Sequence, residues 1–343
     1  MKWTVEEVPE LEGYTVEWAE PGNFYLSRRN VLFASADLVP PFKKVAVINA
    51  PGWKQLASNF RLAQRLLRFM VTNVVPLENG EIFVTFDKSV GVIRNNKYES
   101  LGGLVRPCRV LRSACAIDGR GDIYFGEYLA NDERGEMRVY RYKPGGHSLE
   151  VAYAFPPNSI KHIHGIYFDK FSNSLLCLTG DNAAECRIIR TRDGFDSTET
   201  IGEGDESWRA VSILFDEQAM YYGSDAEFRE NLIYGLDRAS LERKTLGEVS
   251  GTVFYSKQLG DDLFFATTAE NAPSQSENVA AIWHISPEGT CEKLTQFHKD
   301  RWHGTLFMFG TIHFPYKNQS DCELYFSLVG VNEDKRTYRI LRS

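Results

Sequence analysis

Residues 122–128 read DIYFGEY, a short run of apolar and aromatic side chains that ends in polar ones, and similar runs recur along the chain. Runs of this length and composition are typical of β-strands. The other instances are NFYLSR at 23–28, EIFVTFD at 81–87, SLLCLTGD at 174–181, AMYYGSD at 219–225, LFFATTAE at 263–270 and ELYFSLVG at 323–330. Their centres lie 41 to 61 residues apart. A blade of a β-propeller takes about 40–50 residues, so this spacing predicts one blade for each run.

The flanking segments agree with a four-stranded repeat. Most runs follow another strand-like segment, such as GIYFD at 165–169, and precede a third and a fourth, as in 137–155. Turns rich in Pro, Gly and Asp separate the third and fourth segments, for example KPGG at 143–146. We therefore predict an all-β fold, a single β-propeller domain over residues 1–343. Seven four-stranded blades fit best, and six is the alternative.

The last repeat ends after its third strand, in TYRILRS at 337–343. A segment near the N-terminus, KWTVEEV at 2–8 or YTVEW at 14–18, can supply the missing fourth strand. This pairing would close the ring and leave no open sheet edge.

Residues 52–70 break the strand pattern. Apolar residues recur there at steps of three and four, from Trp53 and Leu56 to Phe60 and Met70, with Arg and Lys at other positions. This spacing predicts one amphipathic helix with a basic face. It would pack on the propeller, and contact with a partner protein or an anionic surface is the alternative.

Composition limits the possible functions. The chain has 343 residues and a net charge of -7, which argues against a nucleic-acid partner. No apolar run approaches the ~20 residues of a membrane span, and the N-terminus lacks the apolar core of a signal peptide. The six cysteines form no CxxC pair, so we expect reduced thiols and a cytoplasmic location.

In a propeller, the first strand of each blade begins, and the second strand ends, on one face around the axis. Polar residues at these positions should therefore gather in one funnel. After second strands stand acidic residues and a tyrosine, namely Glu127, Tyr128, Asp181, Asp225, Glu227 and Glu270. Before first strands stand basic and aromatic residues, namely Arg112, His162, His164, Trp208, Arg209, Arg301, Trp302 and His303.

These residue types suit an acidic saccharide. Arg112, Arg209 and Arg301 come from three blades, and guanidinium groups bind carboxylates. Crowded carboxylates such as Glu127, Asp181, Asp225 and Glu270 can supply an acid and a base, because their pKa values separate. Trp208, Trp302 and Tyr128 can stack on sugar faces.

His162 and His164 alternate with Ile163, so both can face the funnel. With Asp181 they are candidate ligands of a divalent metal such as calcium, manganese or zinc. Catalysis without a metal, and simple packing, are the alternatives for this pair.

The turn RTRDGFDSTETI at 190–201, and more faintly YKPGGHSLE at 142–150 and SPEGTCEKL at 286–294, resembles the Asp-box of the sialidase-like (BNR-repeat) propellers. Asp193 and Gly194 keep the places of the box, and its Trp is absent from all three turns. Longer stretches, including IKHIHGIYFD at 160–169 and SWRAVSILF at 207–215, look like a bacterial and archaeal group of such propellers. The resemblance spans residues 74–330 and implies a role connected with glycans.

In true sialidases three arginines hold the substrate carboxylate, so the resemblance offers Arg112, Arg209 and Arg301 for that part. The candidates for the sialidase Tyr–Glu pair are Tyr128 with Glu127, or Tyr221 and Tyr222 near Asp225. The chain is also similar in kind to seven-bladed polysaccharide lyases, which carry His, Tyr and Arg in the mouth.

Three functions follow as hypotheses. The first is cleavage of an acidic saccharide. A hydrolase would use Glu127 or Asp181 as acid and Asp225 as base or nucleophile, whereas a lyase would use His162, His164 or Tyr128 as base. The second is a lactonase-type hydrolase with calcium between Glu127, Asp181 and Asp225. The third is a propeller that recognises a glycan or a protein without catalysis.

Overall fold

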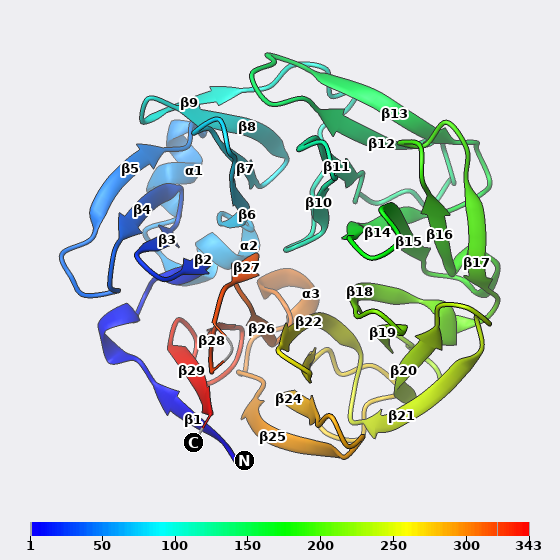
Figure 1. The fold of residues 1–343 in the computed structure, drawn as a ribbon. Coiled ribbons are helices and arrows are strands. Elements are labelled where there is room, and N and C mark those ends of the chain that lie inside the picture. The colour runs from blue at the N-terminus through cyan, green and yellow to red at the C-terminus, as the bar shows by residue number, and fades with distance from the viewer. Residues whose placement is uncertain (1, 321, 343) are drawn as a thin grey trace.

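The computed structural model describes residues 2–320 and 322–342, and within them the strands form seven sheets around a central axis (Figure 1). All antiparallel neighbours follow one another in the chain except where the ring closes. The prediction of an all-β, seven-bladed propeller is confirmed.

The first six sheets each take four consecutive strands. The first three consist of β2 (Thr15–Glu20), β3 (Asn23–Arg28), β4 (Val31–Ser35) and β5 (Lys43–Val47); β6 (Val71–Pro76), β7 (Ile82–Phe86), β8 (Ser89–Arg94) and β9 (Lys97–Ser100); and β10 (Cys115–Ile117), β11 (Ile123–Gly126), β12 (Met137–Tyr142) and β13 (Leu149–Phe155). The next three consist of β14 (His162–Asp169), β15 (Ser174–Gly180), β16 (Arg187–Thr191) and β17 (Glu199–Glu203); β18 (Ala210–Phe215), β19 (Ala219–Ser224), β20 (Asn231–Asp237) and β21 (Arg243–Val249); and β22 (Val253–Leu259), β23 (Asp262–Thr267), β24 (Val279–Ile285) and β25 (Cys291–His298).

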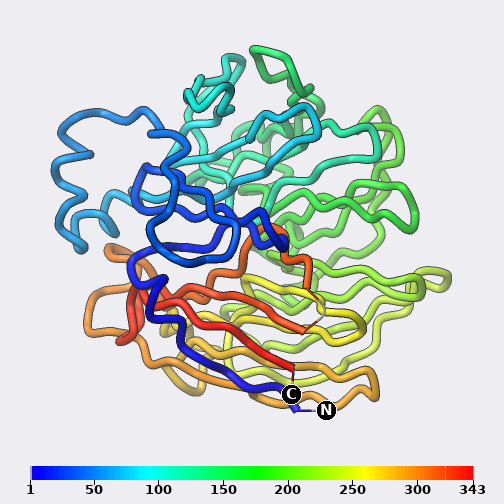
Figure 2. Tube along the Cα trace, turned by 60° about the vertical axis from the view of Figure 1, so that its left-hand side comes forward, coloured from blue at the N-terminus to red at the C-terminus, as the bar shows by residue number. Residues whose placement is uncertain are grey.

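The seventh sheet joins the two ends of the chain. It consists of β26 (Thr311–His313), β28 (Glu323–Val329), β29 (Thr337–Arg342) and β1 (Trp3–Glu7). β1 pairs antiparallel with β29, with Val5 opposite Ile340, and these two strands lie side by side in Figures 1 and 2. The closing strand is therefore KWTVEEV. The other candidate segment forms β2 of the first sheet, to which the short β27 (Lys317–Asn318) adds in parallel.

Most second strands are buried on both faces because each blade packs between two others, and β3 is an exception. All seven residues of β15 are buried, and its sequence SLLCLTG is accordingly an almost continuous apolar run. In the outer strand β13 only the two end residues, Leu149 and Phe155, are buried. Contacts between blades fill the core, for example among Tyr124, Ile166 and Cys177 of neighbouring sheets.

The turn that resembles an Asp-box lies between β16 and β17. The Asp193 carboxylate accepts hydrogen bonds from the backbone N–H of Ser197 at 2.9 Å and from the Thr191 hydroxyl at 2.9 Å. Gly194 adopts a φ of 75°, in the left-handed region that favours glycine. The turn thus has a structural role on the outer side of the blade.

The prediction of one helix over 52–70 is wrong in two respects. The segment forms two six-residue helices, α1 (Gly52–Ala57) and α2 (Arg61–Leu66), separated where Arg29 binds Ser58 Oγ at 2.9 Å and Asn59 Oδ1 at 2.6 Å. The expected faces are also reversed, since Phe60 is 74% exposed whereas Arg65 is 1% exposed. Figure 2 shows the segment projecting from one side of the molecule.

Ion pairs explain this reversal. Arg65 is buried because it pairs with Asp300 and donates to the carbonyl oxygen of Phe307 at 2.5 Å. Arg61 holds both oxygens of Asp334 at 2.7 Å. Asp300 precedes the seventh blade, and Asp334 lies between its strands β28 and β29. The segment between Asp300 and β26 also contains α3 (Gly304–Phe307), the third α-helix of the described residues. Three 3-10 helices, η1 (Pro9–Leu11), η2 (Ala183–Glu185) and η3 (Glu206–Trp208), complete the described elements.

The six cysteines are free thiols, as the sequence predicts. Within the described residues no helix is long and apolar enough to cross a membrane.

Trp3 provides a test of ring closure. Its indole is 5% exposed, packs edge-on against Phe264 at 5.1 Å and donates to Asp262 Oδ1 at 3.2 Å. We expect Trp3→Ala to lower the free energy of unfolding by about 3–5 kcal/mol, the usual cost of removing a buried aromatic side chain. Trp53 is 62% exposed, so the control Trp53→Ala should stay within about 0.5 kcal/mol of the parent. Urea unfolding measures both, and equal effects would contradict this role for β1.

Candidate active site at the mouth of the propeller

The structure gathers several predicted residues at one mouth of the ring. His162 begins β14 and Asp181 directly follows β15 of the same blade, while Arg209 precedes β18 and Asp225 follows β19 of the next blade. Nη2 of Arg209 lies 3.3 Å from Oδ1 of Asp181, and its Nε lies 2.9 Å from Oδ2 of Asp225. Arg209 therefore links the acidic residues of two adjacent blades.

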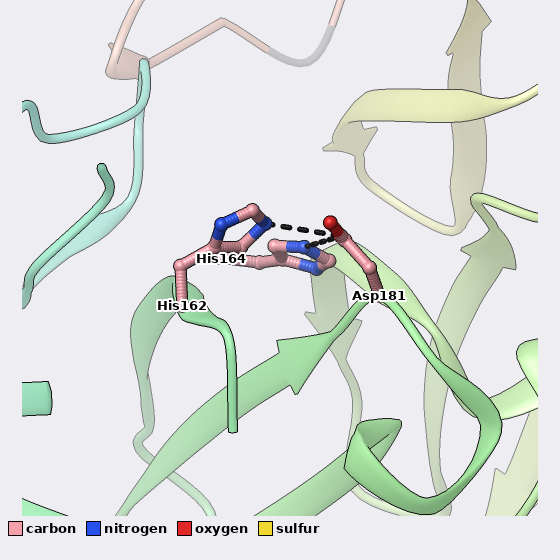
Figure 3. A group of neighbouring side chains, drawn as sticks. All are labelled: His162, His164 and Asp181. Atoms are coloured by element: carbon pink, nitrogen blue, oxygen red, sulfur yellow. Dashed lines mark hydrogen bonds and ion pairs between the residues drawn. The ribbon is translucent and has the colours of Figure 1, made fainter. Parts of the chain in front are cut away.

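His162, His164 and Asp181 form a tight group (Figure 3). Nε2 of His162 lies 3.0 Å and Nε2 of His164 lies 3.5 Å from Oδ1 of Asp181. One ligand atom from each residue lies within 4.8 Å of the others, and among the described residues this is the one group of three or more such side chains.

The local backbone makes this approach possible. The pairing of β14 with β15 shifts between Ile163 and Gly165, so His164 sits in a β-bulge. A Cβ atom added at Gly180 would lie 2.7 Å from the His164 ring and 3.0 Å from Arg209, so only glycine leaves room for both side chains.

The hydrogen bonds of His164 fix its tautomer. Nδ1 lies 2.9 Å from the carbonyl oxygen of Ala210, which can only accept, so Nδ1 carries a proton. Burial lowers the pKa of His164, which favours the neutral ring with a lone pair on Nε2. That lone pair faces the Asp181 carboxylate, and two acceptors in contact are stable only with a cation or a proton between them.

Asp181 is the electrostatic centre of the group. Burial alone would raise its pKa, but the contacts with His162 and His164 and the charge of Arg209 hold it well below the usual range. Lys161 Nζ also lies 3.1 Å from Oδ2. The carboxylate is therefore ionised at neutral pH and available as a ligand.

Tyr128 lies beside the two histidines. Its ring centroid is 4.4 Å from that of His162 and 6.3 Å from that of His164. Burial, followed by the charges of Asp181 and Asp225, raises the pKa of Tyr128 well above its usual value. The phenol is protonated at neutral pH and can donate a proton or a hydrogen bond.

In two other carboxyl groups of the mouth the pKa is raised, whereas that of Asp181 is lowered. Burial, partly offset by the positive charge of Arg209, raises the pKa of Asp225. Burial also raises the pKa of Glu270 to about 7, and its Oε1 is buried without a hydrogen-bond partner among the described residues. Glu270 can therefore both accept and release a proton near neutral pH.

Some predicted residues lie outside this group. Glu127 is 0% exposed, and its oxygens already accept from Arg106 at 2.7 Å and Tyr140 at 2.9 Å. Arg112 is 4% exposed and pairs with the buried Glu17 at 2.5 Å. Both side chains are held in internal ion pairs, so we assign them structural roles.

The expected calcium site between Glu127, Asp181 and Asp225 is not formed. Within the described chain these three carboxylates do not make a metal-binding group, because Glu127 and Asp225 are taken by arginines.

Trp208 does not face the funnel. Its ring stacks on Tyr222 at 6.1 Å, lies under the guanidinium of Arg243 at 4.2 Å, and occupies the space beside Gly202 where a Cβ atom would lie 2.1 Å away. These contacts hold the ring within its own blade, so they give no support to the expectation that it stacks on a sugar.

Arg301, Trp302 and His303 line a cavity of about 450 Å³ together with Glu270. The Arg301 guanidinium lies 4.9 Å from the Trp302 ring. Glu227 is exposed and affects this region through its charge on Glu270. Arg112, Arg209 and Arg301 thus do not form one triad, because Arg112 and Arg209 already hold carboxylates and Arg301 lines the cavity beside Glu270.

The sequence reasoning missed several residues of the mouth. Lys161 directly precedes His162, so the rule applied to first strands could have included it. A second cavity of about 200 Å³ is lined by Tyr128 and by residues that the sequence analysis did not single out, among them Arg68, Arg109 and His313. No sequence signal separates these arginines from ordinary surface residues.

No family model and no curated protein matches the chain. Its fold is similar to that of many solved structures. One is an oligogalacturonate lyase in complex with manganese, with a TM-score of 0.60 and 8% identity, covering 99% of this chain and 96% of that one. Another is the extracellular domain of BT4673 from B. thetaiotaomicron, with a TM-score of 0.59 and 12% identity, covering 99% of this chain. The AfRom2 CNH domain has a TM-score of 0.58 and 10% identity over 100% of this chain and 99% of that one.

These similarities show the seven-bladed fold and nothing finer, because every identity is low. The chain spans about 40% of the length of the BT4673 domain. The resemblance to sialidase-like propellers gains no support from a family match.

The pKa of Glu270 predicts a pH dependence of stability. Because burial raises this pKa to about 7 in the folded protein, the protonated form stabilises the fold at low pH, and this contribution is lost as pH rises through 7. We expect Glu270→Gln to raise the free energy of unfolding relative to the parent by at least about 1 kcal/mol more at pH 8 than at pH 5. Urea unfolding at the two pH values measures this difference. A difference that does not change with pH would contradict the raised pKa.

Proposed function

We propose that this propeller binds an acidic saccharide at the mouth that carries His162, His164 and Asp181 and cleaves it by β-elimination at a uronate. The observation that carries this proposal is the convergence of two imidazoles and an ionised carboxylate beside Arg209, Lys161 and a protonated tyrosine. A metal held by the imidazoles and the carboxylate would bind the sugar carboxylate, and the tyrosine and Glu270 supply proton transfer. The lyase neighbour supports the same chemistry only through its fold.

The ligand group fits a transition metal better than calcium. Two imidazole nitrogens and one carboxylate oxygen are typical ligands of Mn²⁺ or Zn²⁺, whereas calcium prefers oxygen ligands. The hydrogen bond from His164 Nδ1 to Ala210 is the outer contact that usually orients a metal-binding histidine. A metal held by His162, His164 and Asp181 would neutralise the uronate carboxylate and thereby acidify the neighbouring C–H group.

The protein residues divide the proton transfers between them. Ionised Glu270 removes the proton from C5 of the uronate, and the electron pair of that C–H bond forms the C4–C5 double bond. The C4–O bond breaks, and the leaving oxygen takes the proton of the Tyr128 phenol. The products are an unsaturated uronate and a saccharide with a new hydroxyl group, so atoms and charges balance.

A hydrolase is the second candidate, because Asp225 and Glu270 have raised pKa values while the pKa of Asp181 is lowered. Carboxyl groups with separated pKa values can act as acid and base on a glycosidic bond. A sialidase-type reaction is less well supported, since the three arginines lie apart.

Products distinguish the two reactions. We expect the protein to release unsaturated products, detected by their ultraviolet absorbance, from one member of a panel of galacturonate, mannuronate, guluronate and glucuronate oligosaccharides. Glu270→Gln and Tyr128→Phe should each lower the rate at least about 100-fold, the usual contribution of a general base or acid. The control His298→Ala changes an exposed histidine of β25 and should leave the rate unchanged.

If the protein produced new reducing ends without ultraviolet absorbance, the reaction would be hydrolysis rather than elimination. If the protein bound a saccharide saturably but released no product, it would be a recognition propeller, and the proposal of an enzyme would be contradicted.

Metal binding is a separate prediction. Isothermal titration of the metal-stripped protein with Mn²⁺ and Zn²⁺ should show one site per chain, because the three ligand atoms lie close enough to share one ion. His164→Ala should weaken binding at least about 10-fold, since loss of even an outer-shell partner of a ligand usually costs that much, whereas His298→Ala should not. Equal affinity in both variants would exclude this group as the metal site.

A further inference from the structure

Another cavity, distinct from the 450 Å³ and 200 Å³ cavities described above, lies on the propeller axis, away from the histidines. It measures about 640 Å³ and is lined by the later residues of the innermost strands, including Tyr167 of β14 and Lys257 of β22. Tyr167 follows His162 by five residues along β14, which corresponds to roughly 16 Å of strand. The cavity therefore opens at the opposite mouth of the ring, a region to which the proposed reaction assigns no residue.

The lining of this cavity carries positive charge only. Lys170, Lys257 and Lys317 line it, and no Asp or Glu is among the lining residues that the structure describes. This is unusual in a chain whose net charge is -7. Lys317 lies over the Trp18 ring at 5.0 Å and 3.9 Å from Glu20, a residue outside the cavity.

Lys257 is the most distinctive of the three. Its Nζ donates to the carbonyl oxygen of Tyr316 at 2.6 Å, and no carboxylate of the described residues lies within ion-pair distance. Two of its three N–H donors therefore remain for another partner. A charged group in an apolar wall normally has an anionic partner, because burying an unpaired charge is costly.

The pKa values of the side chains that line the cavity support an anionic partner for Lys257. Burial lowers the pKa of Lys257 to about 8, so the ammonium is charged at neutral pH. The other titratable groups facing it are Cys115, Tyr167, Tyr255 and Tyr316, and burial raises the pKa of each of them. They stay neutral, and Lys170 and Lys317 are the remaining charged groups of the lining.

The remaining walls are flat and apolar, with few free acceptors. Trp18 and Tyr316 are stacked, with centroids 6.0 Å apart and an interplanar angle of 6°. The Tyr167 hydroxyl donates to the carbonyl oxygen of Val211 at 2.7 Å, and the Tyr316 hydroxyl donates to that of Cys115 at 2.9 Å.

One hydroxyl adds a donor. Ser256 Oγ donates to Ser212 Oγ at 3.0 Å, so the Ser212 hydroxyl proton is free to turn into the cavity. The cavity thus offers a cation, a hydroxyl donor and aromatic faces to the same ligand.

We propose that this cavity is a binding site for a small monoanionic carboxylate with a flat ring, whose carboxylate pairs with Lys257 and whose ring packs against the aromatic wall. A monoanion matches the single half-buried ammonium that has no carboxylate partner among the described residues. A phosphate dianion would instead require further charged donors at the same depth, usually from arginine. The site is independent of the proposed elimination reaction.

Isothermal titration with trans-cinnamate at pH 7 tests this site, with the neutral cinnamyl alcohol as the matched ligand. We expect the acid to bind at least about 10-fold more tightly than the alcohol, which has the same ring but no charge to pair with Lys257. Lys257→Met should remove this preference, whereas Lys97→Met, at an exposed lysine of β9, should keep it.

The pH dependence gives a second measurement on the parent protein. Affinity for the acid should fall as pH rises from 7 to 9.5, because Lys257 loses its charge over this range while the ligand keeps its own. Affinity for the alcohol should not change in this way. Urea unfolding of Lys257→Met checks that the variant is folded.

Three results would overturn the proposal. They are the absence of saturable binding of the acid, equal affinity for acid and alcohol, and an unchanged preference in folded Lys257→Met.

Discussion

The antiparallel pairing of β1 with β29 is the constraint on which the rest of the structure depends. It joins the N-terminal strand to the last three strands, so the seventh sheet is complete and the ring of sheets is closed. Trp3 fixes this contact to the sixth blade through Asp262 and Phe264. Because the ring is closed, the innermost strands of all the blades converge on one axis, and residues at their ends meet although they are far apart in sequence.

The charge pattern of the candidate active site follows from this convergence. Asp181 lies where two blades meet, with His162, His164 and Lys161 on one side and Arg209 on the other. The cations keep Asp181 ionised. Burial instead raises the pKa values of Asp225 and Glu270, so these two carboxyl groups take up a proton at a higher pH than free ones. One mouth therefore holds an anionic ligand set next to carboxyl groups able to transfer protons.

The two mouths of the axis differ in chemistry because they expose different parts of the same strands. The starts of β14 and β18 carry histidines and an arginine, whereas the ends of β14 and β22 carry tyrosine and lysine. Tyr255 lines both the 640 Å³ cavity and the 200 Å³ cavity beside Tyr128, so the two regions approach each other inside the ring. The propeller can thus offer two separate binding regions along one axis.

The sequence by itself determined the repeat and the face on which polar residues gather, favoured seven blades over six, and limited the closing strand to two N-terminal segments. These features depend on local strand patterns and on their spacing, which is why His162, His164, Asp181 and Arg209 could be expected to meet. It did not determine which charged residues remain free for a ligand. The pairing of Arg112 with Glu17, the seat of Trp208 beside Gly202, and the burial of Arg65 against Asp300 are each set by side chains that come into contact only on folding.

The tertiary structure decided these cases for a physical reason. A buried charge requires an opposite charge at contact distance, and that partner can lie on any blade. The break between α1 and α2 also depends on a tertiary contact, since Arg29 donates to the neutral side chains of Ser58 and Asn59 from another part of the chain. Strand patterns are local properties of the sequence, whereas the pairing of buried charges depends on how the closed ring brings its blades together.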